Sequence, residues 1–225
     1  ASDNTAVGAS ALDTNTTGAS NTAVGKNVLT ANTTGESNAA LGINALYTNT
    51  TGGWNVAIGR NALYYNTTAS NNVGIGFGAL ERNTTGTLNT GVGDGALYLN
   101  TTASNNTALG ASALAANTTG TCLVAIGKGA LNANTTANNN TAIGNNALFD
   151  NTEGFSNVAI GAYAGQNVTT GDCNVLVGND AGENLTTGNN NIALGRGAGT
   201  DAVGNLVTSN NFIVIGNNSH TNAKI

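Results

Sequence analysis

The chain has 225 residues, of which only 8% are charged, with a net charge of −5 and no proline. Its six Lys and Arg residues leave no basic patch that could neutralise phosphates, which argues against nucleic acid and against an anionic membrane surface. No apolar run approaches the roughly 20 residues that cross a bilayer, so we expect no membrane insertion. The low charge also argues against charge-driven disorder.

One 17-residue unit is repeated eleven times over residues 4–190 without insertion or deletion, and a twelfth unit begins at Asn191. Its consensus is Asn-Thr-Ala-Val-Gly-x-x-Ala-Leu-x-x-Asn-Thr-Thr-Gly-x-x, and we number its positions as places one to seventeen. A fixed period indicates stacked structural units. We therefore expect a repetitive shaft at residues 1–195 and an irregular terminal cap at 196–225. The chain contains no methionine, so we expect further sequence upstream of Ala1.

Each unit is too short for two packed helices, and its Asn, Thr and Gly content disfavours helix. Places two to four, residues 56–58 for example, read as a short strand whose first and third residues share one face. The sequence therefore predicts an all-β fold, a parallel β-solenoid (β-roll or β-helix) of 17-residue coils.

Place five is glycine in every unit, and only glycine tolerates positive φ freely. We expect the chain to turn there after each strand. These structural turn glycines are Gly8, Gly25, Gly42, Gly59, Gly76, Gly93, Gly110, Gly127, Gly144, Gly161, Gly178 and Gly195.

Asparagine recurs at places one and twelve, where stacked side chains can hydrogen-bond amide to amide along the solenoid. The place-twelve residues also read as Asn-x-Thr glycosylation sequons, and we favour the structural ladder over a sugar-coated rod. The expected ladder comprises Asn15, Asn32, Asn49, Asn66, Asn83, Asn100, Asn117 and Asn134.

Places eight and nine, usually Ala-Leu, are expected to face inward. In the last units place nine becomes glycine, at Gly165, Gly182 and Gly199, while place twelve becomes Val168 and then Leu185. An unreplaced leucine would leave a cavity costing about 2–5 kcal/mol. We therefore expect places nine and twelve to face the same interior volume.

The period slips after Gly195, because the next equivalent glycine, Gly216, follows 21 residues later. The apolar residues 212–215 are expected to close or cap the stack. Cys122 and Cys173 lie three units apart, about 14 Å at ~4.8 Å per coil, which exceeds the ~7 Å Cα limit of a disulfide. No intrachain bridge is expected.

A single coil buries only a few small side chains. At about 25 cal/mol per Å² of apolar area, this interior barely offsets an ordering entropy of about 1–2 kcal/mol per residue. Self-association along the length would supply further burial, so we expect a homotrimer of chains side by side about a threefold axis.

The phrase Asn-Val-Ala-Ile-Gly-x-x-Ala at residues 55–62 and 157–164 resembles the head repeats of trimeric autotransporter adhesins of the YadA type. That resemblance implies a left-handed, trimeric β-roll, although the adhesin repeat is typically shorter. The complete repeat more closely resembles repeats of bacteriophage tail fibres, which often lead into a self-cleaving, trimerising C-terminal chaperone domain. Residues 209–219 look like the stretch before such a domain.

We expect no catalytic residue, cofactor or metal site. Asp94, Glu81, Asp180 and Glu183 are the carboxylates to weigh as a glycosidase-type pair, of which Asp180 and Glu183 share one unit, but solvated variable loops explain all four. The Gly-x-Gly pattern of residues 74–78 lacks a following helix and reads as turns rather than a phosphate loop. His220 has no partner at metal-ligand spacing.

Exposed aromatic rings stack on sugars or on partner proteins. The aromatic residues Trp54, Tyr47, Tyr64 and Tyr65 are therefore a candidate receptor patch, with the alternative that they cover trimer seams or coil edges.

The repeat pattern, together with its resemblance to tail-fibre repeats, leads us to expect a non-enzymatic extracellular rod: a phage tail-fibre segment or similar appendage, on a virion or cell surface. Its partners are expected to be further copies of itself and a cell-surface glycan or protein receptor. The first alternative is an adhesin head that binds matrix or glycan. The second is an ice-binding solenoid that uses threonine columns such as Thr16 and Thr17.

Overall fold

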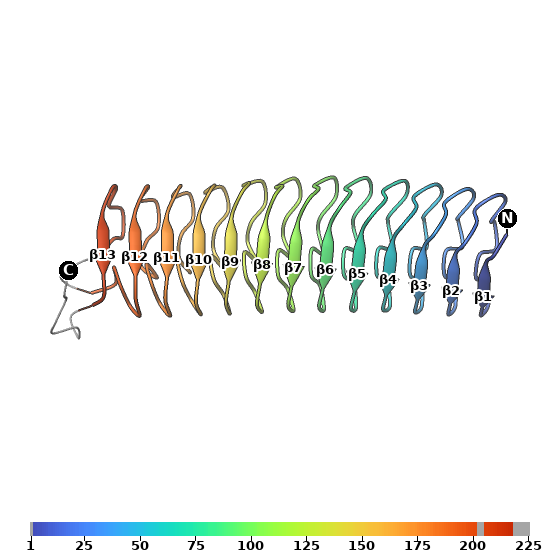
Figure 1. The fold of residues 1–225 in the computed structure, drawn as a ribbon, viewed down its shortest axis with the longest axis horizontal. Helices are drawn as coiled ribbons and strands as arrows, with labels where there is room; N and C mark the ends of the chain where they lie inside the picture. Colours follow the sequence, from blue (N-terminus) through green and yellow to red (C-terminus); the bar gives the residue numbers. More distant parts are fainter. Residues whose placement is uncertain (1, 202–204, 218–225) are drawn as a thin grey trace.

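The computed structural model describes residues 2–201 and 205–217, and over them the chain is a rod of stacked coils with β1 at one end and β13 at the other (Figure 1). Thirteen strands form one sheet in chain order. The strands are β1 Thr5–Val7, β2 Thr22–Val24, β3 Ala39–Leu41, β4 Val56–Ile58, β5 Val73–Ile75, β6 Thr90–Val92, β7 Thr107–Leu109, β8 Val124–Ile126, β9 Thr141–Ile143, β10 Val158–Ile160, β11 Val175–Val177, β12 Ile192–Leu194 and β13 Ile213–Ile215.

Neighbouring strands pair in parallel, with each place opposite the same place of the next coil. Thr5 pairs with Thr22, one 17-residue period later, and Ile192 pairs with Ile213 across the longer final coil. The predicted all-β solenoid of 17-residue coils is therefore confirmed.

The core is a thin column between the strands and the returning chain. Place three is buried from β2 to β12, as are the alanines of place eight and the leucines of place nine from the second coil onward. A Cβ added to Gly74, at place three, would lie 3.2 Å from Leu63 Cγ. Because the place-nine leucine packs so closely there, place three holds only Ala or Gly in nearly every coil.

The place-five glycines turn the chain with φ between 109° and 141°. From Gly8 to Gly178, a Cβ at these positions would lie 2.3 to 2.7 Å from the carbonyl group of the next coil's glycine. Glycine is therefore required for two reasons, its conformation and the close approach of successive backbones.

Three further places have positive φ, which the sequence analysis did not predict. Places seven and seventeen carry Asn, Ser, Gly and other residues, whereas place nine is leucine with φ of 49° to 54° in the first nine coils. A non-glycine residue in this conformation costs about 1–2 kcal/mol. Burial of the leucine side chain offsets that cost, and Gly165, Gly182 and Gly199 avoid it.

The late coils replace the lost leucine from two directions. A Cβ added to Gly165 would lie 3.4 Å from Val168 Cγ2, so places nine and twelve share one interior volume, as expected. The same Cβ would lie 2.5 Å from Leu176 Cδ1, at place three of the next coil. The contribution of place three was missed by the sequence analysis.

The last coil keeps the sheet in register despite its extra length. Leu206 is buried, and its N–H donates to the Gly199 carbonyl at 3.0 Å. In β13, Ile213 and Ile215 are 69% and 68% exposed, because they occupy the outward-facing positions of the strand. Residues 212–215 thus extend the stack by one strand in the structure.

Candidate functional site

The place-twelve asparagines form a continuous amide ladder inside the rod. From Asn32 to Asn151, each Nδ2 donates to the Oδ1 of the asparagine one coil earlier at 2.9 to 3.2 Å. The same Nδ2 donates to the place-fifteen carbonyl of its own coil, as Asn49 does to Gly52 at 2.9 Å. Asn32 to Asn134 are wholly buried, so in the folded rod their sequons offer no free amide hydrogen for glycosylation.

The ladder has one more member than the sequence analysis assigned, Asn151, and ends there. The buried Oδ1 of Asn151 accepts no hydrogen bond within the described residues. The next coil carries Val168 at place twelve, and valine has no donor to offer.

The place-one asparagines form a second ladder, bound to the first. The Oδ1 of Asn21 accepts the N–H of Asn38 at 3.0 Å, and Asn38 Nδ2 donates to the Gly52 carbonyl at 2.9 Å. That carbonyl therefore accepts from both columns. Leu123 lacks the side-chain amide but still donates its N–H to Asn106 Oδ1 at 3.0 Å.

Turn glycines and asparagines are thus parts of the scaffold, and the candidate recognition residues lie at variable places. Tyr47 and Tyr64, at place ten of successive coils, have stacked rings with centroids 5.1 Å apart. The rings of Tyr64 and Tyr65 meet edge-on at 4.6 Å. These three tyrosines form a ring cluster in which Tyr65 is the most open, at 43% exposure.

Trp54 does not join this cluster. It is 56% exposed at place seventeen, and the ring contacts of the described residues do not reach it. The four aromatic residues expected to share one patch therefore divide into a three-tyrosine cluster and a separate exposed tryptophan.

The ring cluster changes the acidity of its central member. Burial raises the pKa of Tyr64, and the neighbouring Tyr47, Tyr65 and Glu81 side chains raise this pKa further, because each would repel a phenolate. The Tyr64 phenol therefore resists ionisation more than a free tyrosine does.

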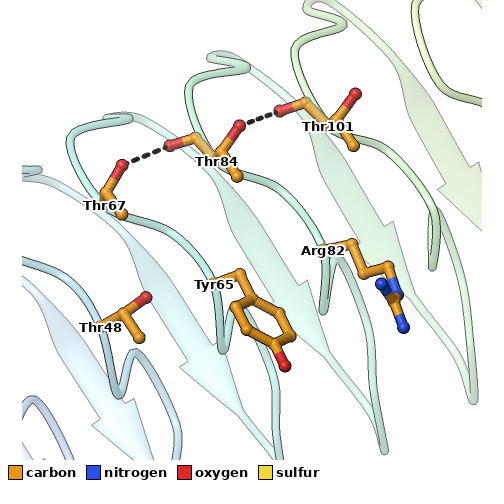
Figure 2. A pocket seen from close by; sticks show the side chains of 6 residues that line it. All are labelled: Thr48, Tyr65, Thr67, Arg82, Thr84 and Thr101. Atoms are coloured by element: carbon orange, nitrogen blue, oxygen red, sulfur yellow. Dashed lines mark hydrogen bonds between the residues drawn. The ribbon is translucent and has the colours of Figure 1, made fainter.

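A shallow groove of about 320 Å³ lies beside Tyr65, between the columns of places eleven and thirteen. In Figure 2, Tyr65 and Arg82 project from neighbouring coils on the same side, beside the row of threonines. The lining residues are Thr48, Tyr65 and Arg82 from place eleven, with Thr67, Thr84 and Thr101 from place thirteen.

The threonine hydroxyls of the groove donate their hydrogens to the protein itself. Thr67 Oγ1 donates to the Thr84 carbonyl at 3.2 Å, and Thr84 Oγ1 to the Thr101 carbonyl at 3.0 Å. Thr101 and Thr48 donate likewise to backbone carbonyls. These hydroxyl oxygens remain available only as acceptors.

Arg82 lines the groove and was not among the expected site residues. Its Cζ lies 5.8 Å from the centroid of the Tyr98 ring, and Tyr98 in turn donates its hydroxyl to Glu81 Oε1 at 3.4 Å. No ion pair of Arg82 with another described residue occurs. The signal that could have found it is its position at place eleven, one period after Tyr65.

The four carboxylates weighed as a catalytic pair lie on three different coils. Glu81 accepts from Tyr98, and Asp94 is exposed on the following coil. Asp180 Oδ1 accepts from Asn179 Nδ2 at 3.2 Å, and the Glu183 N–H donates to the Asp180 carbonyl at 3.3 Å. These contacts are those of turn residues.

The remaining sequence candidates have no assembled site around them. Residues 74–78 run from β5 into the turn at Gly76, and both cysteines are exposed and free. The described part of the chain has no group of three or more His, Cys, Asp or Glu residues that could hold a metal ion. His220 lies outside the described residues. Nor do the residues placed by the structure include any helix suited to cross a membrane.

Three comparisons, with protein-family models, with curated proteins and with solved structures, each found no match.

Proposed function

We propose that the chain is a non-catalytic, extracellular structural rod, a segment of a phage tail fibre or of a similar appendage on a virion or cell surface. In this role the chain is a rigid spacer between the two ends of a fibre, and three copies assemble side by side as a homotrimer. About twelve coils at ~4.8 Å per coil would make a spacer of about 60 Å. The resemblance of its repeat to tail-fibre repeats supports this assignment.

The observation that carries the proposal is an apolar stripe along the outer face of the sheet. We call it the strand face, made of places two and four of every coil from β1 to β12. Place four is always Val, Ile or Leu, place two is Thr, Val, Ala or Ile, and all are exposed or half-buried. A continuous apolar surface of this length is typical of an interaction site rather than of a free monomer.

A second and third copy of the same chain fit this surface best. The strand face is uncharged throughout, so identical copies would meet there without electrostatic repulsion. Its rows recur once per coil, and an identical chain has rows at the same spacing. A face about 60 Å long and about 10 Å wide offers about 600 Å², less than the ~800 Å² per partner of a standard interface, so contacts beside the strand face would have to add to it.

The interior explains how such a rod would stay stiff. Backbone hydrogen bonds join each coil to the next at many places, as from Gly25 N–H to the Val7 carbonyl at 2.8 Å. The two asparagine ladders add side-chain bonds in the same direction. Bending the rod would stretch the bonds on its outer side and compress those on its inner side, since both sets run along its axis.

Ice binding is less well supported than the fibre role. The place-thirteen threonine hydroxyls donate into the next coil, as from Thr33 to the Thr50 carbonyl at 3.0 Å, which leaves place fourteen as the exposed threonine column. Places thirteen and fourteen lie in bends, outside the strands. Thermal hysteresis of the purified chain would restore this alternative.

Sedimentation equilibrium tests the trimer. The wild-type chain is expected at three times its 22.1 kDa mass. The variant Leu109→Lys with Ile160→Lys charges the strand face at two side chains that are 37% and 39% exposed and is expected to sediment as a monomer. A wild-type monomer would overturn the proposal.

The matched control is Thr119→Lys with Thr170→Lys, which places the same charges at exposed place-fourteen positions of the same two coils. This control is expected to remain trimeric. Unchanged β-type circular dichroism in both variants would show that the coils still fold, and monomers in both would contradict a specific role of the strand face.

A further inference from the structure

We propose that Tyr47 and Tyr64 form an oxidative cross-linking site, at which a one-electron oxidant joins the two rings as a dityrosine and ties the third coil covalently to the fourth. The site uses place ten and none of the strand face. The inference therefore goes beyond the spacer role and does not depend on assembly of the rod.

The two rings are held in the arrangement that this coupling needs. Their centroids lie 5.1 Å apart, and their planes are inclined to each other by only 16°. In rings stacked so nearly parallel, equivalent carbon atoms are separated by about the distance between the centroids. The ortho carbons of the two phenols, which carry much of the unpaired electron in a phenoxyl radical, are therefore neighbours before any oxidation occurs.

The backbone keeps the two tyrosines in register. The N–H of Thr48 donates to the Tyr64 carbonyl at 3.1 Å. The N–H of Ala31 donates to the Tyr47 carbonyl at 3.2 Å. Tyr65 packs edge-on against Tyr64, with ring centroids 4.6 Å apart. Holding two reacting groups side by side makes their coupling effectively unimolecular, which favours a link within the chain over a link between separate chains.

The coupling removes one electron and one proton from each phenol. Both rings are half-buried, so part of each ring faces solvent, which takes up the protons. The two phenoxyl radicals form a carbon–carbon bond between ortho carbons, and the hydrogen on each of these carbons then moves to the phenolic oxygen by exchange with solvent. Hydrogen peroxide, used by a peroxidase that oxidises one electron at a time, accepts the two electrons and two protons and becomes two water molecules.

The other tyrosines are less well placed to couple. Tyr98 also occupies place ten, but Glu81 lies at that place in the coil between it and Tyr64 and accepts the Tyr98 hydroxyl hydrogen at 3.4 Å. Tyr163 lies on the tenth coil, at place seven. An edge-on contact such as that of Tyr64 with Tyr65 directs the edge of one ring at the face of the other, so it does not pair their ortho carbons.

Easily oxidised sulfur atoms are absent from the neighbourhood of the stack. The chain contains no methionine, and its two cysteines, Cys122 and Cys173, lie on the seventh and tenth coils. Thiols and thioethers compete for oxidants when they lie close to the reacting group. Tyr47 and Tyr64, on the third and fourth coils, therefore have no sulfur competitor beside them.

A dityrosine at this site would strengthen the rod along its axis. The link joins residues one 17-residue repeat apart and runs in the same direction as the hydrogen bonds of the amide ladder. A covalent link that closes a loop lowers the entropy of the unfolded chain. It would therefore resist separation of the third coil from the fourth, in addition to the hydrogen bonds that already join them.

Photo-oxidation of the full chain with a ruthenium tris-bipyridine complex and persulfate tests the site, because this mixture supplies a one-electron oxidant without a peroxidase. The oxidised chain is unfolded in urea and digested with trypsin, which cuts after Arg60, between the two tyrosines, and yields peptides 27–60 and 61–82. Mass spectrometry should find these two peptides joined, at their summed mass less two hydrogen atoms. The oxidised chain should keep the size of a single chain on a denaturing gel.

Two matched pairs of variants localise the link, since phenylalanine keeps the ring but has no phenol to oxidise. Tyr64→Phe should abolish the joined peptides, whereas Tyr65→Phe, one residue away in the same peptide, should retain them. Tyr47→Phe should also abolish them, and Tyr98→Phe should not. The oxidised wild-type chain should unfold at a higher urea concentration than the untreated chain, and oxidised Tyr47→Phe should not.

Absence of the joined peptides from the wild type, their persistence in Tyr64→Phe, or links only between separate chains would each overturn the proposal. An unchanged urea midpoint of the oxidised wild type would overturn the covalent tie between the coils. These outcomes are separate from the sedimentation result, since a monomeric rod keeps the two rings stacked and a trimeric rod can fail to couple them.

Discussion

Leu176 fills the space that a side chain on Gly165 would occupy, with its Cδ1 2.5 Å from the position of a Cβ on that glycine. In the earlier coils the arrangement is reversed, with leucine at place nine and Ala or Gly at place three. The two places therefore exchange one side chain between them while the interior volume of the rod is kept.

This exchange predicts a strong coupling between the two positions. Gly165→Leu alone overpacks the coil and is expected to lower the free energy of unfolding by about 1–3 kcal/mol. Leu176→Ala alone is expected to cost about 2–5 kcal/mol, because it leaves a cavity. The double variant should lose less unfolding free energy than the two single variants lose together, as measured by urea unfolding. Additive losses would contradict the exchange.

The turn glycines predict a sharp contrast between two nearby positions. A Cβ on Gly93 would lie 2.5 Å from the Gly110 carbonyl oxygen, whereas a Cβ on Gly95 would meet nothing within 4 Å. Gly93→Ala is therefore expected to cost about 3 kcal/mol or more, since it adds a backbone clash to an unfavourable φ.

Gly95→Ala is the matched control, because φ at Gly95 is 62° and only the left-handed conformation is unfavourable, at about 1 kcal/mol. Thermal unfolding followed by circular dichroism compares the two variants. Similar losses would show that close approach of successive coils is not what requires glycine at place five.

The sequence alone predicted the coil, its period and its turns, because residues that recur at a fixed spacing occupy equivalent positions in successive coils of a stack. The turn at place five could be predicted because only glycine adopts a positive φ freely. Place nine could not, since leucine is normally excluded from positive φ and only its burial, seen at Leu63 for example, makes the conformation acceptable. Tertiary packing overrides local preference at that place.

The candidate site was predictable only in part for a similar reason. Aromatic side chains stand out in a sequence with few of them, so Tyr64 and Tyr65 were expected. Arg82 was not, because its relation to Tyr65 lies across coils. Likewise, the Gly52 carbonyl accepts hydrogen bonds from Asn38, 14 residues earlier, and from Asn49, 3 residues earlier. Only the path of the backbone brings these residues of the two asparagine columns together.

The buried ladder predicts a pH-dependent variant. Asn83 Nδ2 donates to Asn66 Oδ1 at 3.0 Å and to the Gly86 carbonyl at 2.9 Å. Asn83→Asp would replace these donors with a buried carboxylate facing acceptors, and burial would raise its pKa above that of the unfolded chain. We expect a loss of more than about 3 kcal/mol at neutral pH.

The sign of the pH effect follows from the raised pKa. A group of this kind favours the folded state while protonated and loses that effect as pH rises through its folded pKa. The Asn83→Asp variant should therefore regain stability relative to wild type on acidification in urea unfolding. Thr85→Asp, at an exposed place of the same coil, is the control, and a similar profile for both variants would contradict the buried ladder.

The ring cluster predicts the order in which tyrosines ionise. Burial raises the pKa of Tyr64, with Tyr47, Tyr65 and Glu81 adding to the shift, so the folded chain resists loss of this proton. The stability that neutral Tyr64 provides is complete below the ordinary tyrosine pKa of about 10 and is lost as pH rises through the higher folded value. Phenolate absorbance of the folded chain should therefore show a late-titrating component.

Tyr64→Phe should remove that late component, and Tyr47→Phe should shift it to lower pH, because a neighbouring phenolate is no longer formed. Tyr163→Phe, on a distant coil, should leave it unchanged. Urea unfolding above pH 10 should show a steeper loss of stability for wild type than for Tyr64→Phe. If Tyr64→Phe left the late component in place, Tyr47, Tyr64 and Tyr65 would not be packed in solution as they are in the structure. The Tyr65 ring beside the groove would then lack its contact with Tyr64.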